Sequence, residues 1–274
     1  MHSLMRLVLV GVVVLFPGRK LQAAPATAVT VDAQGTATVD VISELTEAGK
    51  KIDRPTPECP AYYFLVLSDY QPGGQLAFWQ RPPPSLGAVA RILKEELSRQ
   101  SYLAATPAHP PLLLLKFSWG YAAPVLTPGA FAAGVGGDVP RPALVSLCAM
   151  QNAGDMLELT GGIRARRTWQ ETRDPWCVNL PEELGGAAGF PRYYATLEAF
   201  EYPASPRLAG RPLWTTHVSV PYWGHYIDQA IPALIATGAP LFGRDMKTPL
   251  FIKISSVREG RVVVGKPVGK TGSW

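Results

Sequence analysis

The sequence predicts an α+β fold in which helices pack on one face of a mixed or antiparallel sheet. Apolar segments of strand length are bounded by turn residues, and the order strand, strand, helix, strand occurs twice. In addition, 47% of the 274 residues are hydrophobic, enough to bury a large core. We expect a single globular domain over residues 57–274, or two similar halves at 57–142 and 143–274.

The first 24 residues have the plan of a secretory signal peptide. Arg6 gives a basic start, the run LVLVGVVVLF at 7–16 is apolar, and small residues follow from Ala23. That run is too short to cross a bilayer, which needs about 20 residues. We therefore expect export to the periplasm or the extracellular space, with no transmembrane segment left in the mature chain. The alternatives are a buried N-terminal strand and an uncleaved interfacial segment.

Residues 25–56 are small, polar and proline-bearing. This composition is typical of a linker, with at most one short helix around 41–52. We predict a flexible N-terminal arm in front of the folded domain.

The first strand, strand, helix, strand unit begins at residues 61–69, AYYFLVLSD, which are rich in aromatic and branched side chains. The residues YQPGG at 70–74 predict a turn, and 75–80 would complete a hairpin. Ser85 can cap a helix that ends near residue 100, because apolar side chains recur at helical spacing at Leu86, Val89, Ile92, Leu93 and Leu97. The run PLLLLKFSWG at 111–120 predicts a buried strand.

The middle of the chain is irregular. Residues 121–142 are rich in proline and glycine, and they lack the lysine and the following helix of a phosphate-binding loop. We predict a loop there, and then an apolar helix through residue 150. The pair Gly161-Gly162 should interrupt the segment between that helix and residue 167.

The second unit repeats the first in outline. Residues 192–202 and 213–220 alternate like strands and predict a hairpin. A helix comes next over about 224–237, in which Pro232 should cause a bend or a split. Residues 250–256 and 260–264 predict two final strands.

Two segments carry a resemblance to known proteins. The run VARILKEELSRQSYLAATPAHPPLLLLKFSWG at 89–120 resembles the helix, tyrosine step and proline-led strand of certain bacterial envelope proteins of unknown function. Residues 194–221, with GRPLWTTHVSV, resemble their paired strands. The resemblance covers about half of the mature chain and implies an exported envelope domain without an assigned activity. Unlike the lipoprotein members, this chain has no lipid-attachment cysteine.

Composition and motifs exclude several function classes. Charged residues make up only 17% of the chain, whereas a nucleic-acid binder normally shows a clustered basic face with interleaved aromatics. The best local cluster is Arg164, Arg166 and Arg167 in IRARRTW, and its alternating spacing is typical of a solvated face of a strand, so we expect no nucleic-acid partner. No cofactor motif occurs, and we expect no cofactor.

Three cysteines, Cys59, Cys148 and Cys177, allow at most one internal disulfide in an oxidising compartment. Three pairings are possible. Cys148 lies in an apolar run that suits a buried free thiol, whereas the other two lie in proline-bearing loops. We predict that any bridge joins Cys59 to Cys177.

The histidines offer weak candidates for chemistry. No pair has the spacing of zinc ligands on one helical face, so we predict no metal site. His217 lies in a predicted strand, while His225 and Asp228 begin the following helix. If that strand leads directly into the helix, the three side chains could meet in a cofactor-independent hydrolase site, which is the alternative function.

The aromatic residues favour binding. Seven tryptophans are present, and YWGHY at 222–226 concentrates Tyr222, Trp223 and Tyr226 at a strand-to-helix junction. Flat aromatic faces can stack on a sugar or a peptide, although core packing is the ordinary use of such residues. Our leading hypothesis is therefore a noncatalytic, exported envelope protein that binds another envelope protein or a small ligand.

Overall fold

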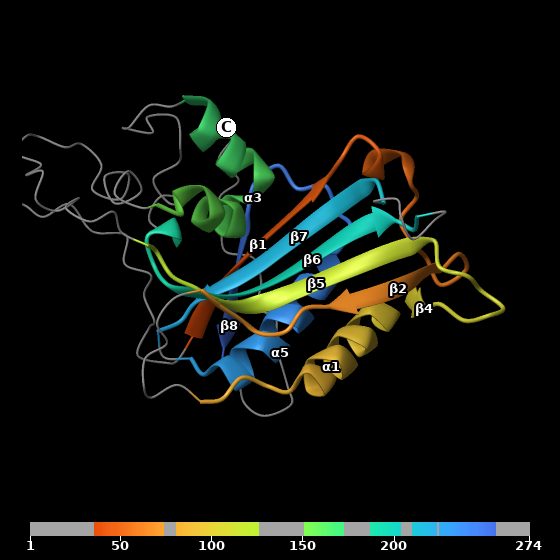
Figure 1. The fold of residues 1–274 in the computed structure, drawn as a ribbon, viewed down its shortest axis with the longest axis horizontal. Helices are drawn as coiled ribbons and strands as arrows, with labels where there is room; N and C mark the ends of the chain where they lie inside the picture. The colour runs from red at the N-terminus through yellow and green to blue at the C-terminus, as the bar shows by residue number, and fades with distance from the viewer. Residues whose placement is uncertain are drawn as a thin grey trace, which may run out of the picture.

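The computed structural model describes residues 36–73, 81–125, 151–172, 187–203, 210–223 and 225–255. They form the predicted α+β fold, built on one mixed sheet of eight strands (Figure 1). The strands are β1 (Thr36–Leu45), β2 (Ala61–Leu67), β3 (Gln71–Gly73), β4 (Tyr102–Ala104), β5 (Leu113–Ala122), β6 (Arg192–Glu201), β7 (Pro212–Pro221) and β8 (Leu250–Ser255). The helices are α1 (Leu86–Arg99), α3 (Ala153–Thr172) and α5 (Ile227–Gly238), with 3-10 turns η1 (Gly49–Lys51) and η2 (Ala239–Leu241).

The strand order is β4-β2-β5-β6-β7-β1-β8, and β3 pairs with the far end of β5. β2 runs parallel to both β4 and β5, whereas β5, β6, β7, β1 and β8 are antiparallel neighbours. The predicted hairpin of β6 and β7 is confirmed. The residues predicted as a turn after β2 contain β3, and the strand predicted at 75–80 lies outside the described residues.

Strand β1 corrects the prediction of a flexible arm over residues 25–56. It is an interior strand, between β7 and β8. Val39 and Val41 are fully buried in the main core, while Asp40 and Glu44 point to the opposite face. Because only alternate residues of a strand face one side, these carboxylates made an interior strand resemble a polar linker. The folded domain therefore begins earlier than residue 57.

A buried ion pair joins β1 to β6. The guanidinium of Arg192 is 1% exposed and donates to the Asp40 carboxylate. It also donates to Ser219 Oγ at 3.0 Å and to the carbonyl of Ala187 at 3.2 Å. Such a charge is tolerated in a protein interior only when it is paired and hydrogen-bonded, as it is here.

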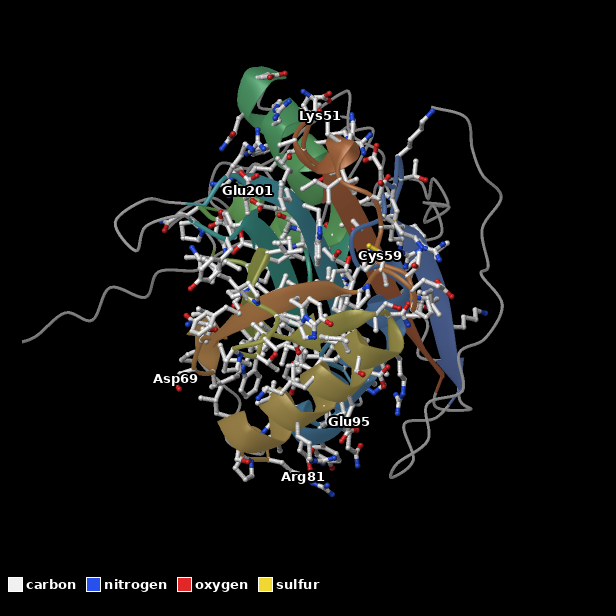
Figure 2. All side chains as sticks on the ribbon, turned by 90° about the vertical axis from the view of Figure 1, so that its right-hand side faces the viewer. Lys51, Cys59, Asp69, Arg81, Glu95 and Glu201 are labelled. Carbon is white, nitrogen blue, oxygen red and sulfur yellow. The ribbon has the colours of Figure 1, made fainter. Side chains whose placement is uncertain are left out.

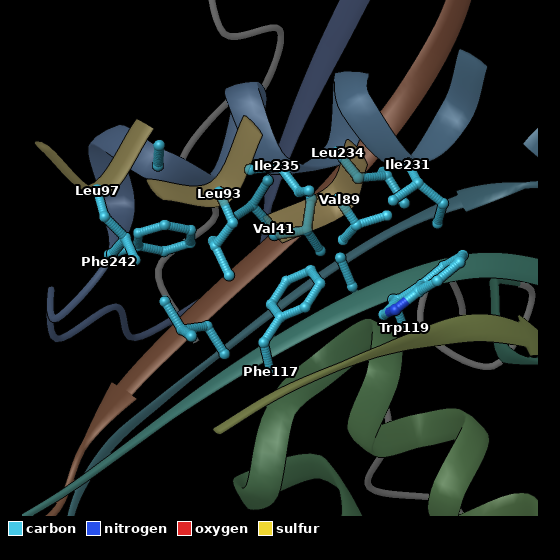
Figure 3. Packing of buried hydrophobic residues seen from close by; sticks show 14 of the residues in the cluster. Val41, Val89, Leu93, Leu97, Phe117, Trp119, Ile231, Leu234, Ile235 and Phe242 are labelled. Carbon is cyan, nitrogen blue, oxygen red and sulfur yellow. The ribbon is translucent and has the colours of Figure 1, made fainter. Parts of the chain in front are cut away.

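Helices α1 and α5 pack against each other and cover one face of the sheet, which contains the main core (Figures 1 and 3). Helix α1 begins where the sequence predicts, with Ser85 Oγ accepting from the Ala88 amide at 3.3 Å. Its apolar side places Val89, Leu93 and Leu97 in the core, all buried. Complete burial of each such side chain contributes roughly 1.5–3 kcal/mol.

Helix α5 continues through Pro232, so that this proline does not split it. The missing amide removes one hydrogen bond near the start of the helix. The packing of Ile231, Leu234 and Ile235 holds the helix on the sheet, because all three are buried in the main core (Figure 3).

Helix α3 lies on the opposite face, over β7 and β1 (Figure 1). The sequence predicts helices on one face of the sheet only, and α1 and α5 follow that prediction. Helix α3 departs from it, because it forms a second layer on the other face with its own small core around Met156 and Leu157. The predicted interruption by the glycine pair is confirmed, since Gly162 has φ +80°. A Cβ there would lie 2.4 Å from Glu44 Oε2, which accepts from the Ile163 amide and so caps the second half of the helix.

Several predictions fall on residues outside the described ranges. They are the signal peptide at 1–24, the first part of the arm, the loop and apolar helix at 126–150, and the last strand at 260–264.

Candidate functional site

His217 lies in the middle of β7 and points to the face that α3 covers. Its strand neighbours Val218 and Val220 belong to the main core on the other face. Ser219, which shares the face of His217, donates to the Leu159 carbonyl of α3 at 3.2 Å. The alternation of the strand therefore places this imidazole between the sheet and α3.

The His217 ring is 5% exposed and has one hydrogen-bonding side chain. Its Nδ1 lies 3.0 Å from Thr196 Oγ1 on β6. Its Nε2 lies 3.6 Å from Glu158 Oε1 on α3 and has no hydrogen-bond partner among the described residues. Burial lowers the pKa of His217, so the imidazole is neutral at pH 7.

The predicted hydrolase residues are not brought together. Asp228 is in the first turn of α5, where its Oδ2 lies 3.3 Å from Arg81 Nη1, and His225 stands just before that helix. Burial lowers the pKa of His225 as well. The sheet separates Asp228 from His217, because α5 packs on the face opposite to α3. Strand β7 does lead directly into α5, but α5 packs on the face of the sheet opposite to the one to which His217 points.

The predicted aromatic cluster is partly at the surface. The Tyr222 and Trp223 rings are 4.3 Å apart, and Tyr222 packs edge-on against Tyr121 at 5.9 Å. Trp223 is exposed, and so is Tyr226, whose ring carries the Arg81 guanidinium 4.2 Å from its centroid. Tyr222 thus packs the cluster against the sheet, whereas Tyr226 makes a separate cation–π contact with Arg81.

Cys59 is exposed, and it is the one cysteine within the described ranges, where it forms no disulfide. Both Cys148 and Cys177 lie outside the described ranges, so the bridge from Cys59 to Cys177 stays a prediction. The exposed thiol lies at the end of the molecule seen in Figure 2, where Cys59 and Glu201 are visible above α1.

That end of the molecule contains a cavity of about 630 Å³, which we call the end groove. Pockets of this volume are in the usual range for ligand sites. Chain segments far apart in the sequence form it: the stretch after β1, the starts of β2 and β5, and the facing ends of β6 and β7. Its walls are mostly apolar, and they include Leu45, Ile52, Pro55, Pro60, Ala61, Pro111, Leu112, Leu113, Tyr202, Leu213 and Trp214.

The apolar lining continues onto the surface. Tyr202 donates its backbone amide to the Leu112 carbonyl at 2.9 Å, and its ring meets Phe64 edge-on at 6.3 Å. Val66 follows Phe64 on the same side of β2. Ile52, Leu112, Tyr202, Phe64 and Val66 are each between 41% and 61% exposed, and we call these five the apolar rim.

Polar groups border the end groove at a few points. Arg54 donates to the Pro240 carbonyl at 3.0 Å, and burial together with the nearby Arg244 lowers the pKa of Arg54. Glu201 pairs with Arg211 at 3.2 Å on the opposite border. An apolar surface with a polar border is the usual anatomy of a protein interface.

One glycine shapes the wall of the end groove. Gly243 has φ +66°, and a Cβ there would lie 2.8 Å from the Tyr102 hydroxyl. Tyr102 is buried, which raises its pKa to about 12 and keeps it a neutral part of the wall.

Within the described part of the chain, no group of three or more histidine, cysteine, aspartate or glutamate side chains can hold a metal ion. None of the helices described is long and apolar enough to span a membrane.

The end groove is not predicted from the sequence. Leu112 and Tyr202 stand at the borders of predicted strands, and Ile52 in the predicted arm. Their shared exposure arises only when β5 and β6 pair, so no local pattern indicates it. The segment 111–120 is expected to be a buried strand, and Leu112 near its start departs from this expectation.

Comparison with known proteins gives little. No protein-family model matches the sequence, and no curated protein matches it. A crystal structure of a PDZ domain protein from Parabacteroides distasonis ATCC 8503 aligns over 80% of this chain with 10% identity and a TM-score of 0.38. The chain covers only 39% of that protein's length. A likeness this weak carries no argument about function.

Proposed function

We propose that this chain is a noncatalytic binding protein whose end groove receives an apolar segment of a partner protein. The observation that carries the proposal is the cavity of about 630 Å³ whose apolar lining runs out into the exposed apolar rim. Large exposed apolar patches on soluble proteins are usually interaction sites.

The rim favours a polypeptide over a small molecule as the occupant. A small ligand would fill the groove between Ile52 and Leu112 and leave the rings of Tyr202 and Phe64 in water. A peptide can place one apolar side chain in the groove and pack the next residues along β2. Arg54 and Glu201 at the border would then fix its direction.

The hydrolase alternative receives no such support. A general base must reach the proton that it abstracts, and an acid that orients it must touch its ring. Asp228 lies across the sheet from His217 and is paired with Arg81 instead.

A peptide selection tests the proposal. Random peptides displayed on phage are selected against the full chain under reducing conditions, and the selected peptides are measured by fluorescence polarisation. We expect sequences with clustered apolar residues, which bind at least tenfold more weakly to Leu112→Asp. Leu86→Asp is the matched control, because Leu86 is also exposed but lies on α1, away from the groove.

The Cys59 thiol gives a second readout, since this exposed side chain lines the groove. Bound peptide should slow its alkylation by iodoacetamide, followed by mass spectrometry of the Cys59 peptide. Peptides that bind Leu112→Asp as well as the unmodified chain, or a selection that yields no binder, would refute the proposal.

Export to the bacterial envelope is a separate part of the proposal, and residues 1–24 support it. Fractionation of a bacterium that expresses the chain, with N-terminal sequencing of the product, tests this part. We expect a shortened protein in the envelope fraction, and an intact chain in the cytosol contradicts export.

A further inference from the structure

A second cavity, of about 420 Å³, lies between α3 and the sheet, and we call it the α3 cavity. It shares no lining residue with the end groove. Its floor is a row of polar side chains across three strands, because Ser118 pairs with Thr196 and Thr196 pairs with His217 in the strand register. Tyr194 and Glu198 stand on either side of Thr196 along β6 and share its face.

The roof comes from the first turns of α3. Asp155, Glu158 and Leu159 line the cavity, because residues three and four apart share one side of a helix. The backbone segment of β3 closes one end.

Three carboxylates line the α3 cavity, and no lysine or arginine is among the described residues that line it. Arg166 stands behind the roof and pairs with Glu158 and, at 3.4 Å, with Asp155. The arginine therefore compensates the two carboxylates of the roof, whereas Glu198 on the floor has no ion pair of its own among the described residues.

Glu198 is the carboxylate without a partner. Among the described residues, no donor forms a hydrogen bond or an ion pair with it. Lys116 is its cross-strand neighbour, but the Lys116 ammonium lies over the Phe200 ring, 4.5 Å from the centroid. Burial raises the pKa of Glu198, and the positive charge of Lys116 offsets only part of this rise, to which the charge of Glu158 adds.

His217 provides an independent observation. Its ring lines the cavity, is only 5% exposed, and has an Nε2 without a hydrogen-bond partner in the described part of the chain. When Nδ1–H donates to Thr196 Oγ1, Nε2 presents a lone pair beside the Glu158 carboxylate, 3.6 Å away. Two acceptors then face each other with no donor from the described residues between them, and this is costly for the buried His217 ring.

From this arrangement we infer that the α3 cavity binds an organic cation, an ammonium or guanidinium group carried by a small molecule. The cation would donate to the Glu198 carboxylate, which has no ion pair among the described residues, and to Glu158 Oε1 and His217 Nε2, which face each other. The Tyr194 ring offers an aromatic wall for the organic part. The α3 cavity is distinct from the end groove, so the result of its test does not depend on whether the proposed function is correct.

A charge-matched pair of probes tests the inference. Benzylamine and benzyl alcohol have the same ring and nearly the same size, and only the amine is charged at pH 7. Each is titrated into the full chain and followed by ¹H–¹⁵N NMR. We expect benzylamine to bind at least tenfold more tightly than benzyl alcohol, with shifts at the Thr196 and His217 amides.

Glu198→Gln keeps the shape of the side chain and removes its charge, and it should reduce benzylamine affinity at least tenfold. Glu201→Gln on the same strand is the matched control, since Glu201 is outside the cavity and should have no effect. Ser118→Phe is a second variant, which fills the cavity without changing a charge and should abolish binding.

Three results would overturn the inference. They are equal affinity for the alcohol and the amine, benzylamine affinity unchanged in both Glu198→Gln and Ser118→Phe, and no benzylamine binding at millimolar concentrations.

Discussion

Replacement of Asp40 by asparagine should destabilise the chain strongly, because it leaves the Arg192 guanidinium buried without a counter-charge. Arg192 is 1% exposed and cannot reach water, and its remaining acceptors are Ser219 Oγ and one backbone carbonyl, both neutral. Breaking a buried pair by removal of one partner costs about 3–5 kcal/mol. That is a large share of the roughly 5–15 kcal/mol by which whole domains are stable.

Urea denaturation followed by far-UV circular dichroism measures this loss. Glu95→Gln is the control, because Glu95 pairs with Arg91 at 3.0 Å on the exposed side of α1. Exposed pairs of this kind contribute at most about 0.5 kcal/mol. The double variant Asp40→Leu with Arg192→Met removes both charges and should recover most of the loss. A loss of stability below about 1 kcal/mol for Asp40→Asn, or no recovery in the double variant, would show that the Arg192 guanidinium does not depend on Asp40 as its buried counter-charge.

Three further changes test other parts of the fold. Gly162→Ala should lower the free energy of unfolding by about 1–3 kcal/mol in a urea titration, because φ at this position is +80° and the new Cβ would clash with Glu44. An unchanged free energy of unfolding would contradict the kink that we describe in α3. Leu93→Ala should cost about 2–5 kcal/mol by the same method, since Leu93 is fully buried, and a cost like that of an exposed leucine would refute its place in the core. Burial lowers the pKa of His217, so the unfolded chain binds a proton at this residue more readily than the folded chain does. The stability that the neutral, buried His217 contributes is therefore fully present above about pH 6.5 and is lost as the pH falls. The urea midpoint should therefore drop less between pH 7 and pH 5 in His217→Gln, while His225 keeps part of the slope, and identical slopes contradict the assignment.

Local patterns predict those elements whose stability depends on one apolar side. Helix α1 has a serine cap and apolar residues at helical spacing, and the hairpin of β6 and β7 alternates clearly. Strand β1 escapes such patterns because its second face is polar and finds its partners far away in the sequence. Asp40 is matched by Arg192 and Glu44 by Arg164, and neither match is visible without the fold.

The candidate sites are harder to predict for the same reason. The face to which His217 points decides which residues it meets, and that depends on which side of the sheet each helix covers. No local pattern indicates that α3 lies on the far side, so Glu158 taken alone resembles a solvent-exposed residue. The end groove likewise combines residues from six separate stretches of the chain, and its apolar character is a property of their assembly.

The position of β1 also has a consequence for biosynthesis. Ser43 on this early strand bonds Thr216 on β7, a residue 173 positions later, at 2.7 Å. A growing chain therefore exposes Val39 and Val41 on the ribosome until β7 and β8 have been made, which is the behaviour of a topology with high contact order. A nascent chain truncated before residue 212 should remain sensitive to protease along this segment, and only release of the last strands should protect it.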